Sequence, residues 1–178
     1  MRGFFASVAD LLRRCSYESV LEVGGGEGLL LHHLRSQLEG TRVAAVDVDR
    51  DGIAAAHRNS SFAEYALASA YDLPFRSGCF DLVICCEVLE HLEDPAAGCR
   101  ELARVGRCDC LLSVPREPLW RALNLARGAY WDDWGNTPGH LNHWSPADFR
   151  RFVSAELEIV DSGAPLPWTV VLARKRAG

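Results

Sequence analysis

Apolar positions along the chain follow two periods, one typical of buried strands and one typical of amphipathic helices. Short apolar runs predict strands over residues 20–24, 42–47, 65–68, 80–86, 108–114, 157–160 and 168–173. Apolar residues at helical spacing predict helices over residues 4–15, 29–38, 53–57, 95–105, 119–127 and 146–153. Because strands and helices alternate, the pattern predicts an α/β fold with a doubly wound sheet. We expect the sheet to be mostly parallel, with the last two strands adding an antiparallel C-terminal hairpin.

Two of the predicted helices carry clear start signals. Asp94 precedes Pro95, and Ser145 precedes Pro146. An Asp or Ser side chain at the N-cap accepts a hydrogen bond from the first turn, and proline suits the first helical position. We therefore expect helices to begin at these two prolines.

The first strand runs into a turn that is dense in glycine, at Gly24, Gly25, Gly26 and Gly28. Glycines let the backbone approach a ligand closely, and the helix that follows presents free N–H groups to it. A dinucleotide fingerprint would need its third glycine at position 29, which is Leu29. The turn therefore predicts a nucleotide-type ligand other than NAD, and a dehydrogenase is an outside possibility.

The predicted ends of later strands add polar residues at the same edge of the sheet. Asp47 ends the second strand and can accept hydrogen bonds from both hydroxyls of a ribose, although a plain turn or helix-cap role is the alternative. Residues 69–71 follow the third strand, where backbone and small polar groups could contact an adenine edge. Residues 86–87 end the fourth strand. The set predicts a site for an adenosine-containing ligand.

Composition and charge narrow the classes of partner. The formal net charge is −5 and the one basic block is residues 174–176, so a nucleic-acid substrate is disfavoured. No apolar run reaches the roughly 20 residues that span a bilayer, and charged residues interrupt the N-terminal region too early for a secretory signal. The seven cysteines include no Cys-x-x-Cys pair and are expected to be reduced. These features predict a cytoplasmic protein with no membrane partner.

Four motifs in order, at residues 20–28, 44–47, 72–75 and 80–92, resemble the class I S-adenosylmethionine-dependent methyltransferases. The resemblance is to the type 11 branch, which acts mostly on small molecules. It implies a Rossmann-like fold and S-adenosylmethionine as cofactor. It also implies that Glu22 supports the methionine ammonium group, that Asp47 binds the ribose and that Cys86 lies beside the reactive end. The full expected cofactor set is Glu22, Gly24, Gly25, Gly26, Asp47, Val48, Ser69, Ala70, Tyr71 and Cys86.

The resemblance also divides the chain, which we expect to form one methyltransferase domain over residues 1–178. Residues 1–19 would form an N-terminal helix, 20–114 the cofactor-binding core, 115–146 a substrate lid, and 147–178 the C-terminal helix and strands. The lid is rich in aromatic residues, which small-molecule sites commonly use. The expected substrate residues are Glu117, Tyr130, Trp131 and Trp144.

A proton acceptor for methyl transfer is expected among the histidines, with His140 first, His143 second and His91 third. Each of the three has a structural alternative, in which the ring caps a helix or bonds to its own loop. No metal site is expected, because His140 and His143 lack an evident third ligand.

Three functions are consistent with these residues. The first is methyl transfer from S-adenosylmethionine to an O or N atom of a small-molecule acceptor. The second keeps the cofactor but takes a protein or RNA acceptor. The third is a non-catalytic, cofactor-binding partner subunit, because many relatives have Asp where Ser69 stands and only about 19 residues precede the first strand. A homodimer is also compatible with the sequence.

Overall fold

Seven strands form one sheet in the order β3-β2-β1-β4-β5-β7-β6. The computed structural model describes residues 2–59 and 61–176, so both ends of the expected domain span lie outside the described residues. The strands are β1 (Ser19–Val23), β2 (Arg42–Asp47), β3 (Glu64–Leu67), β4 (Phe80–Cys86), β5 (Gly106–Pro115), β6 (Leu157–Gly163) and β7 (Trp168–Lys175). Strands β1 to β5 are parallel, while β7 pairs antiparallel with both β5 and β6. The predicted mostly parallel sheet with an antiparallel C-terminal hairpin is confirmed.

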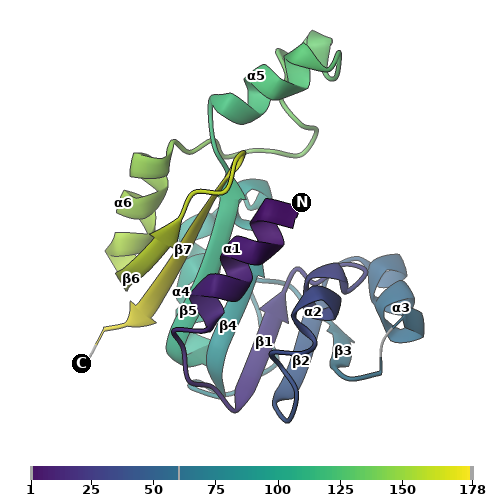
Figure 1. Cartoon of the computed structure of the whole chain (residues 1–178), viewed down its shortest axis with the longest axis vertical. Helices are drawn as coiled ribbons and strands as arrows, with labels where there is room; N and C mark the ends of the chain where they lie inside the picture. Colours follow the sequence, from purple (N-terminus) through teal and green to yellow (C-terminus); the bar gives the residue numbers. More distant parts are fainter. Residues whose placement is uncertain (1, 60, 177–178) are drawn as a thin grey trace.

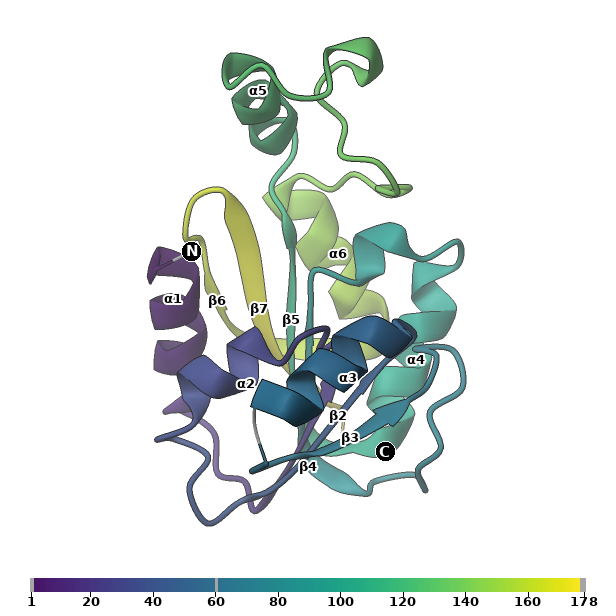
Figure 2. The same cartoon turned by 90° about the vertical axis from the view of Figure 1, so that its right-hand side faces the viewer.

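Helices cover both faces of this sheet (Figures 1 and 2). They are α1 (Arg2–Leu12), α2 (Leu29–Leu34), α3 (Arg50–Asn59), α4 (Pro95–Val105), α5 (Leu119–Ala126) and α6 (Pro146–Glu156), with short 3-10 helices η1 (Leu89–His91) and η2 (Trp131–Asp133). Helix α2 ends at Leu34, earlier than predicted, and the residues that follow form turns closed by bonds such as Gln37 N to Leu34 O at 2.8 Å. None of the described helices is long and apolar enough to cross a bilayer.

Two hydrophobic clusters fill the two sides of the sheet. One joins α1, α2 and α3 to alternate strand residues such as Val20 and Leu82. The other joins α4 and α6 to the intervening residues, such as Leu21 and Val83. Residues that alternate along a strand point to opposite faces, so each central strand contributes to both clusters. This double burial is the reason that the strands are apolar throughout.

Both expected N-caps are present. The Asp94 carboxylate accepts a hydrogen bond from Ala97 N at 2.9 Å, and the Ser145 hydroxyl accepts one from Asp148 N at 3.2 Å. Helices α4 and α6 begin directly after these residues, at Pro95 and Pro146. The start signals in the sequence are therefore confirmed.

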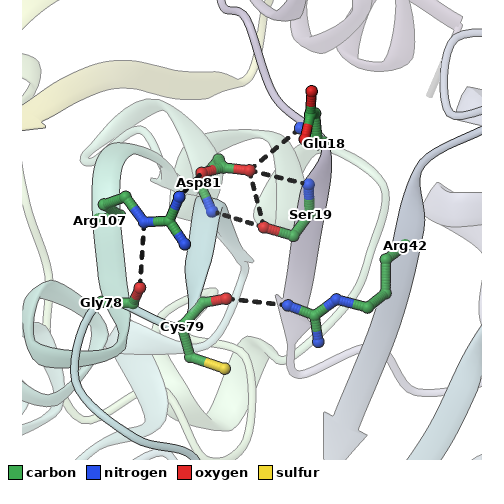
Figure 3. A network of polar contacts seen from close by, with 7 residues as sticks. All are labelled: Glu18, Ser19, Arg42, Gly78, Cys79, Asp81 and Arg107. Carbon is green, nitrogen blue, oxygen red and sulfur yellow. Dashed lines mark hydrogen bonds and ion pairs between the residues drawn. The ribbon is translucent and has the colours of Figure 1, made fainter.

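A polar network joins the strands at the edge where β1 and β4 begin (Figure 3). Asp81 Oδ2 accepts hydrogen bonds from the amides of Glu18 and Ser19 and from the Ser19 hydroxyl, at 3.1, 3.0 and 2.8 Å. Its other oxygen, Oδ1, lies 3.0 Å from Arg107 Nη1. Burial opposes ionisation, but these partners together lower the pKa of Asp81. The network fixes the amino edge of the sheet, opposite the edge that carries the site.

Residues 119–138, which we call the arm, extend beyond the carboxyl edge of the sheet and contain α5 and η2 (Figures 1 and 2). The arm leaves from the end of β5, and the chain returns to the body through residues 139–144. Two large aromatic side chains on the arm, Trp131 and Trp134, are 66% and 76% exposed. The expected lid thus consists of a projecting arm and a return segment that contacts the body.

Candidate functional site

The glycine turn after β1 is held by backbone bonds and permits no side chain at its first position. The amides of Gly24 and Gly25 donate to Val46 O at 2.8 and 3.2 Å, which fixes the turn against β2. Gly24 has a φ of 79°, in the left-handed region, and a Cβ built there would overlap Val88 Cγ2. Only glycine satisfies both constraints, so the turn offers bare backbone to whatever lies above it.

Asp47 braces this turn from the end of β2. Its Oδ2 accepts a hydrogen bond from Gly26 N at 2.8 Å, and its Oδ1 accepts one from Asp49 N at 2.8 Å. The carboxylate is half-buried and lines an adjacent hollow, with acceptor capacity left on both oxygens. That position suits the binding of two vicinal hydroxyls.

Two hollows flank the glycine turn and share Gly24 and Glu87 in their walls. The first, of about 370 Å³, lies against the ends of β2, β3 and β4. The second, of about 290 Å³, lies between the turn and α1. Every residue of the expected cofactor set lines one of them. The first hollow takes Gly24, Asp47, Val48, Ser69, Ala70 and Tyr71, and the second takes Glu22, Gly24, Gly25, Gly26 and Cys86.

Glu22 lies in the wall of the second hollow with an unsatisfied carboxylate oxygen. The residue is only 3% exposed, and its Oε2 has no hydrogen-bond partner among the described residues. Burial, and next the charge of Asp47, raise the pKa of Glu22 to about 8. A buried carboxylate that lacks a donor favours a cationic group beside it. The site therefore fits the ammonium group of the S-adenosylmethionine methionine portion.

Glu87 is not in the expected cofactor set but lines both hollows. Its backbone has a φ of 59°, unusual for a residue with a side chain. Its carboxylate accepts hydrogen bonds from the Ser113 hydroxyl and from Trp168 Nε1, both at 2.9 Å. Burial raises its pKa to about 7 although these bonds oppose the shift. Its position directly after β4 is the sequence feature that could have placed it in the site.

The second hollow is closed on one side by α1, which contributes Phe4 and Phe5 to the lining. Phe5 stacks on His33 with ring centroids 4.0 Å apart, and Phe4 packs on Trp168 with centroids at 5.1 Å. In the sequence, Phe4 and Phe5 are predicted only as part of the apolar face of a helix. The short segment before β1 therefore reaches the hollow, a contact that periodicity alone does not reveal.

The structure brings two of the three candidate histidines together. His91 and His140 meet edge to face with ring centroids 4.8 Å apart, and His91 lines the first hollow. Burial, followed by the charges of His91 and His143, lowers the pKa of His140 to about 4. His143 is exposed and its Nε2 lies 2.7 Å from Asn136 Oδ1, so its ring bonds within its own loop.

None of the four expected substrate residues lines either hollow. Tyr130 and Trp131 lie on the arm and are exposed. Trp144 packs on Phe149 and Phe152 of α6, with ring centroids at 5.7 and 5.2 Å. Glu117 is buried, which raises the pKa of its carboxyl, and its Oε2 lies 3.4 Å from Arg121 N. Their contact with an acceptor stays a prediction.

The strand order, the glycine turn after β1, the acid after β2 and the buried Glu22 together define an S-adenosylmethionine-dependent methyltransferase fold. Residues 21–113 match the family described as "Methyltransferase domain". The chain belongs to this family of S-adenosylmethionine-dependent methyltransferases, and its cofactor is S-adenosylmethionine. The predicted family and cofactor are confirmed.

Known relatives and solved structures agree with this assignment. A probable S-adenosylmethionine-dependent methyltransferase from Mycobacterium tuberculosis is 36% identical over 104 residues, which cover 58% of this chain and 37% of the relative. A ubiquinone biosynthesis O-methyltransferase from Xanthomonas oryzae is 30% identical over 164 residues, covering 84% of this chain and 67% of the relative. The chain thus spans about 37% of the length of the mycobacterial relative.

A chain from the complex between the Haloferax volcanii Trm112 methyltransferase activator and the putative methyltransferase shares the fold with a TM-score of 0.79. The two chains are 17% identical, and the match covers 99% of this chain and 91% of that one. At this identity the likeness concerns the fold alone.

Proposed function

We propose that the chain transfers a methyl group from S-adenosylmethionine to an O or N atom of a small-molecule acceptor. The observation that carries the proposal is the Glu22 carboxylate oxygen in the second hollow, which has no hydrogen-bond partner among the described residues. The two hollows together are lined by every expected cofactor residue. The similarity to a ubiquinone biosynthesis O-methyltransferase supports an O-methylated small molecule as the first class to test.

Each wall of the two hollows has a distinct task in this proposal. Glu22 binds the ammonium group in the second hollow, and Asp47 binds the ribose hydroxyls in the first. Ser69, Ala70 and Tyr71 border the adenine. When bound, S-adenosylmethionine supplies an electrophilic methyl group on a sulfonium. The protein's main contribution is alignment, because a displacement at carbon requires donor and acceptor in line.

The acceptor would enter beside η1, where His91 lines the first hollow. His140 packs edge to face on the ring of His91. A hydroxyl or amine acceptor releases a proton, and the candidate acceptors of that proton are His140, His143 and His91. Because its pKa is about 4, His140 is neutral near pH 7 but only weakly basic. Of the three rings, His91 has the position that best suits contact with the acceptor.

Calorimetry and a turnover assay test the proposal. We expect S-adenosylhomocysteine to bind with one site per chain, and a panel of phenols, carboxylates and amines to include an acceptor that yields S-adenosylhomocysteine. Binding of NAD without binding of S-adenosylhomocysteine would overturn the proposal. Turnover only with protein or RNA acceptors would show that the substrate is a macromolecule and not a small molecule.

A second candidate is a cofactor-binding subunit that works with a partner. It is supported by the similarity in fold to a chain from the complex with the Trm112 methyltransferase activator. The exposed Trp131 and Trp134 on the arm give such a partner an aromatic contact surface. Co-purification of a stable second subunit, together with cofactor binding but no turnover by the isolated chain, would favour this function. A catalytically active single chain, by light scattering and assay, would exclude it.

A further inference from the structure

Three potential metal ligands meet where η1 contacts the return segment of the lid. Glu90 and His91 come from η1, and His140 comes from the return segment. One ligand atom of each residue lies within 4.8 Å of those of the other two. Glu90 and His91 are adjacent in the sequence but His140 lies about 50 positions later, so the tertiary fold creates the group.

Glu90 has no other role among the described residues that would explain its burial. It is 1% exposed, and neither carboxylate oxygen has a hydrogen-bond partner in the described part of the chain. A buried carboxylate is normally paired or bound to a metal, because isolation from both water and donors is unfavourable. Burial, and next the nearby Glu87, raise the pKa of Glu90 well above its usual range. A bound cation would offset both the loss of hydration and the repulsion between the two carboxylates.

Backbone and amide contacts hold the two segments in register. The amides of Leu141 and Asn142 donate to Glu90 O at 2.8 and 3.0 Å, and Asn142 Nδ2 donates to Leu92 O at 2.6 Å. These bonds fix His140 against η1 without engaging any of the three ligand side chains. The group is therefore preorganised, as a metal site needs to be.

His91 also has the outer contact that metal-bound histidines usually have. Its Nδ1 lies 2.9 Å from Gly139 O, and because a carbonyl only accepts, Nδ1 carries the proton. The lone pair of the ring is therefore on Nε2. A second hydrogen bond of this kind orients the ring and sets the tautomer in metal sites.

We propose that Glu90, His91 and His140 form a site for a divalent transition-metal ion at the acceptor end of the first hollow. Two imidazoles and one carboxylate suit Zn²⁺, Mn²⁺, Co²⁺ or Fe²⁺ better than Ca²⁺ or Mg²⁺, which prefer oxygen ligands alone. Three protein ligands leave coordination positions open, as in metal sites that act on substrates. His91, one of the three ligands, lines the first hollow, so the proposed site borders that hollow.

The chemical consequence rests on the proposed function. A hydroxyl acceptor bound to the ion would lose its proton to solvent more readily, because a metal ion lowers the pKa of a bound hydroxyl. The oxygen lone pair then forms the new bond to the methyl carbon as the sulfur–methyl bond breaks. The bonding pair stays on sulfur, which yields S-adenosylhomocysteine. The site thus favours oxygen acceptors, and His91 and His140 act as ligands and not as the proton acceptor.

Metal titration of the chelator-treated protein tests the site without any acceptor. We expect calorimetry with Zn²⁺ to give one ion per chain, and Co²⁺ to give visible absorption bands of a bound ion. Glu90→Gln and His140→Ala should each weaken binding at least tenfold, while His32→Ala, which removes an exposed histidine from α2, should not. Glu90→Gln keeps the side-chain volume, and a thermal unfolding curve verifies that this variant is folded.

Two results would overturn the inference. One is the absence of stoichiometric binding of Zn²⁺ or Co²⁺ to the wild-type protein, and the other is equal binding by the wild type and Glu90→Gln. S-Adenosylhomocysteine titrated into the same samples separates the two proposals. Cofactor binding with turnover that a chelator leaves unchanged removes the metal site and keeps the function. Metal binding without cofactor binding keeps the metal site and removes the proposed function.

Discussion

The Asp47 carboxylate lies 2.8 Å from the amide nitrogen of Gly26, so the end of β2 holds the turn that follows β1. The same carboxylate lines the first hollow. One side chain therefore shapes the backbone that borders the second hollow and offers acceptors in the first. Substitution at this position tests both tasks at once.

Asp47→Ala should weaken the binding of S-adenosylhomocysteine by about 10- to 150-fold, which corresponds to about 1.5–3 kcal/mol for the loss of a hydrogen bond to a charged group. Calorimetry measures the change. Asp49→Ala is a matched control, because Asp49 also accepts a hydrogen bond from a backbone amide two residues on, at 3.0 Å, but lines neither hollow. Equal affinities for Asp47→Ala and the wild type would remove Asp47 from the site.

Glu22→Gln should stabilise the free protein and weaken cofactor binding. Folding raises the pKa of Glu22 to about 8, so between about pH 4.5 and 8 the folded state keeps a proton that the unfolded state releases. The free energy of unfolding of the wild type therefore falls as the pH rises through this range. Glutamine does not ionise, so the variant should gain at least about 1 kcal/mol over the wild type by pH 8.

Urea unfolding at pH 5 and pH 8 measures this difference, and calorimetry at pH 8 measures the affinity for S-adenosylhomocysteine, which should fall about tenfold or more. A stability difference that does not change between the two pH values would show that Glu22 is ionised in the folded protein.

Gly24→Ala should destabilise the fold more than Gly40→Ala, although both glycines have a φ near 78°. A Cβ at position 24 would overlap Val88, whereas nothing lies within 4 Å of a Cβ at position 40. Backbone strain should lower the free energy of unfolding by about 1–2 kcal/mol at either position. Overpacking should add about 1–3 kcal/mol at position 24 only.

Chemical denaturation of both variants checks the comparison. The double variant Gly24→Ala/Val88→Ala should regain part of the stability lost to overpacking, but none of the stability lost to backbone strain. Equal losses at positions 24 and 40 would contradict the close contact between the turn and Val88.

Asp81→Asn should lower the free energy of unfolding by about 2 kcal/mol, because the uncharged amide oxygen is a weaker acceptor for Glu18 and Ser19 and the amide NH2 would face Arg107 (Figure 3). The pKa of Asp81 is lowered by folding, so its stabilisation is present above about pH 4 and is lost as the pH falls through the folded pKa. The difference from the wild type should therefore be constant between pH 5 and 8 and shrink in acid.

Denaturant unfolding across the pH range measures it. Asp10→Asn, which changes an exposed carboxylate on α1, should have little effect and serves as control. A difference that persists unchanged at pH 3 would show that the charge of Asp81 is not what stabilises this edge.

The sequence was sufficient to predict the sheet and the gathering of the expected cofactor residues at its carboxyl edge, because both depend on local patterns. Apolar runs define the strands, and the glycine spacing with Asp47 marks the ends of β1 and β2. Positions at strand ends meet at one edge whatever the loops between them do. The expected cofactor residues therefore converge on the two hollows.

The acceptor end was not predictable in the same way, because it depends on how the lid folds back. The spacing of His140 and His143 suggested a pair, but the hydrogen bonds of Asn142 place His140 beside His91. Glu90 is assigned no role from the sequence. In the fold it is buried, and its backbone carbonyl accepts hydrogen bonds from the return segment.

The arm is joined to the body near its base, where Glu117 N donates to Trp144 O at 3.0 Å and Trp120 of the arm packs on Trp168 of β7 with ring centroids 5.8 Å apart. Its own turns are held largely from within, by bonds such as that from Asn124 Nδ2 to Gly135 O at 2.7 Å. Sequence changes on its outer surface therefore need not disturb the sheet or the cofactor hollows. Such independence makes the arm a region in which new acceptor preferences could evolve, or be engineered by exchange of the segment, while the methyl-donor machinery is inherited intact.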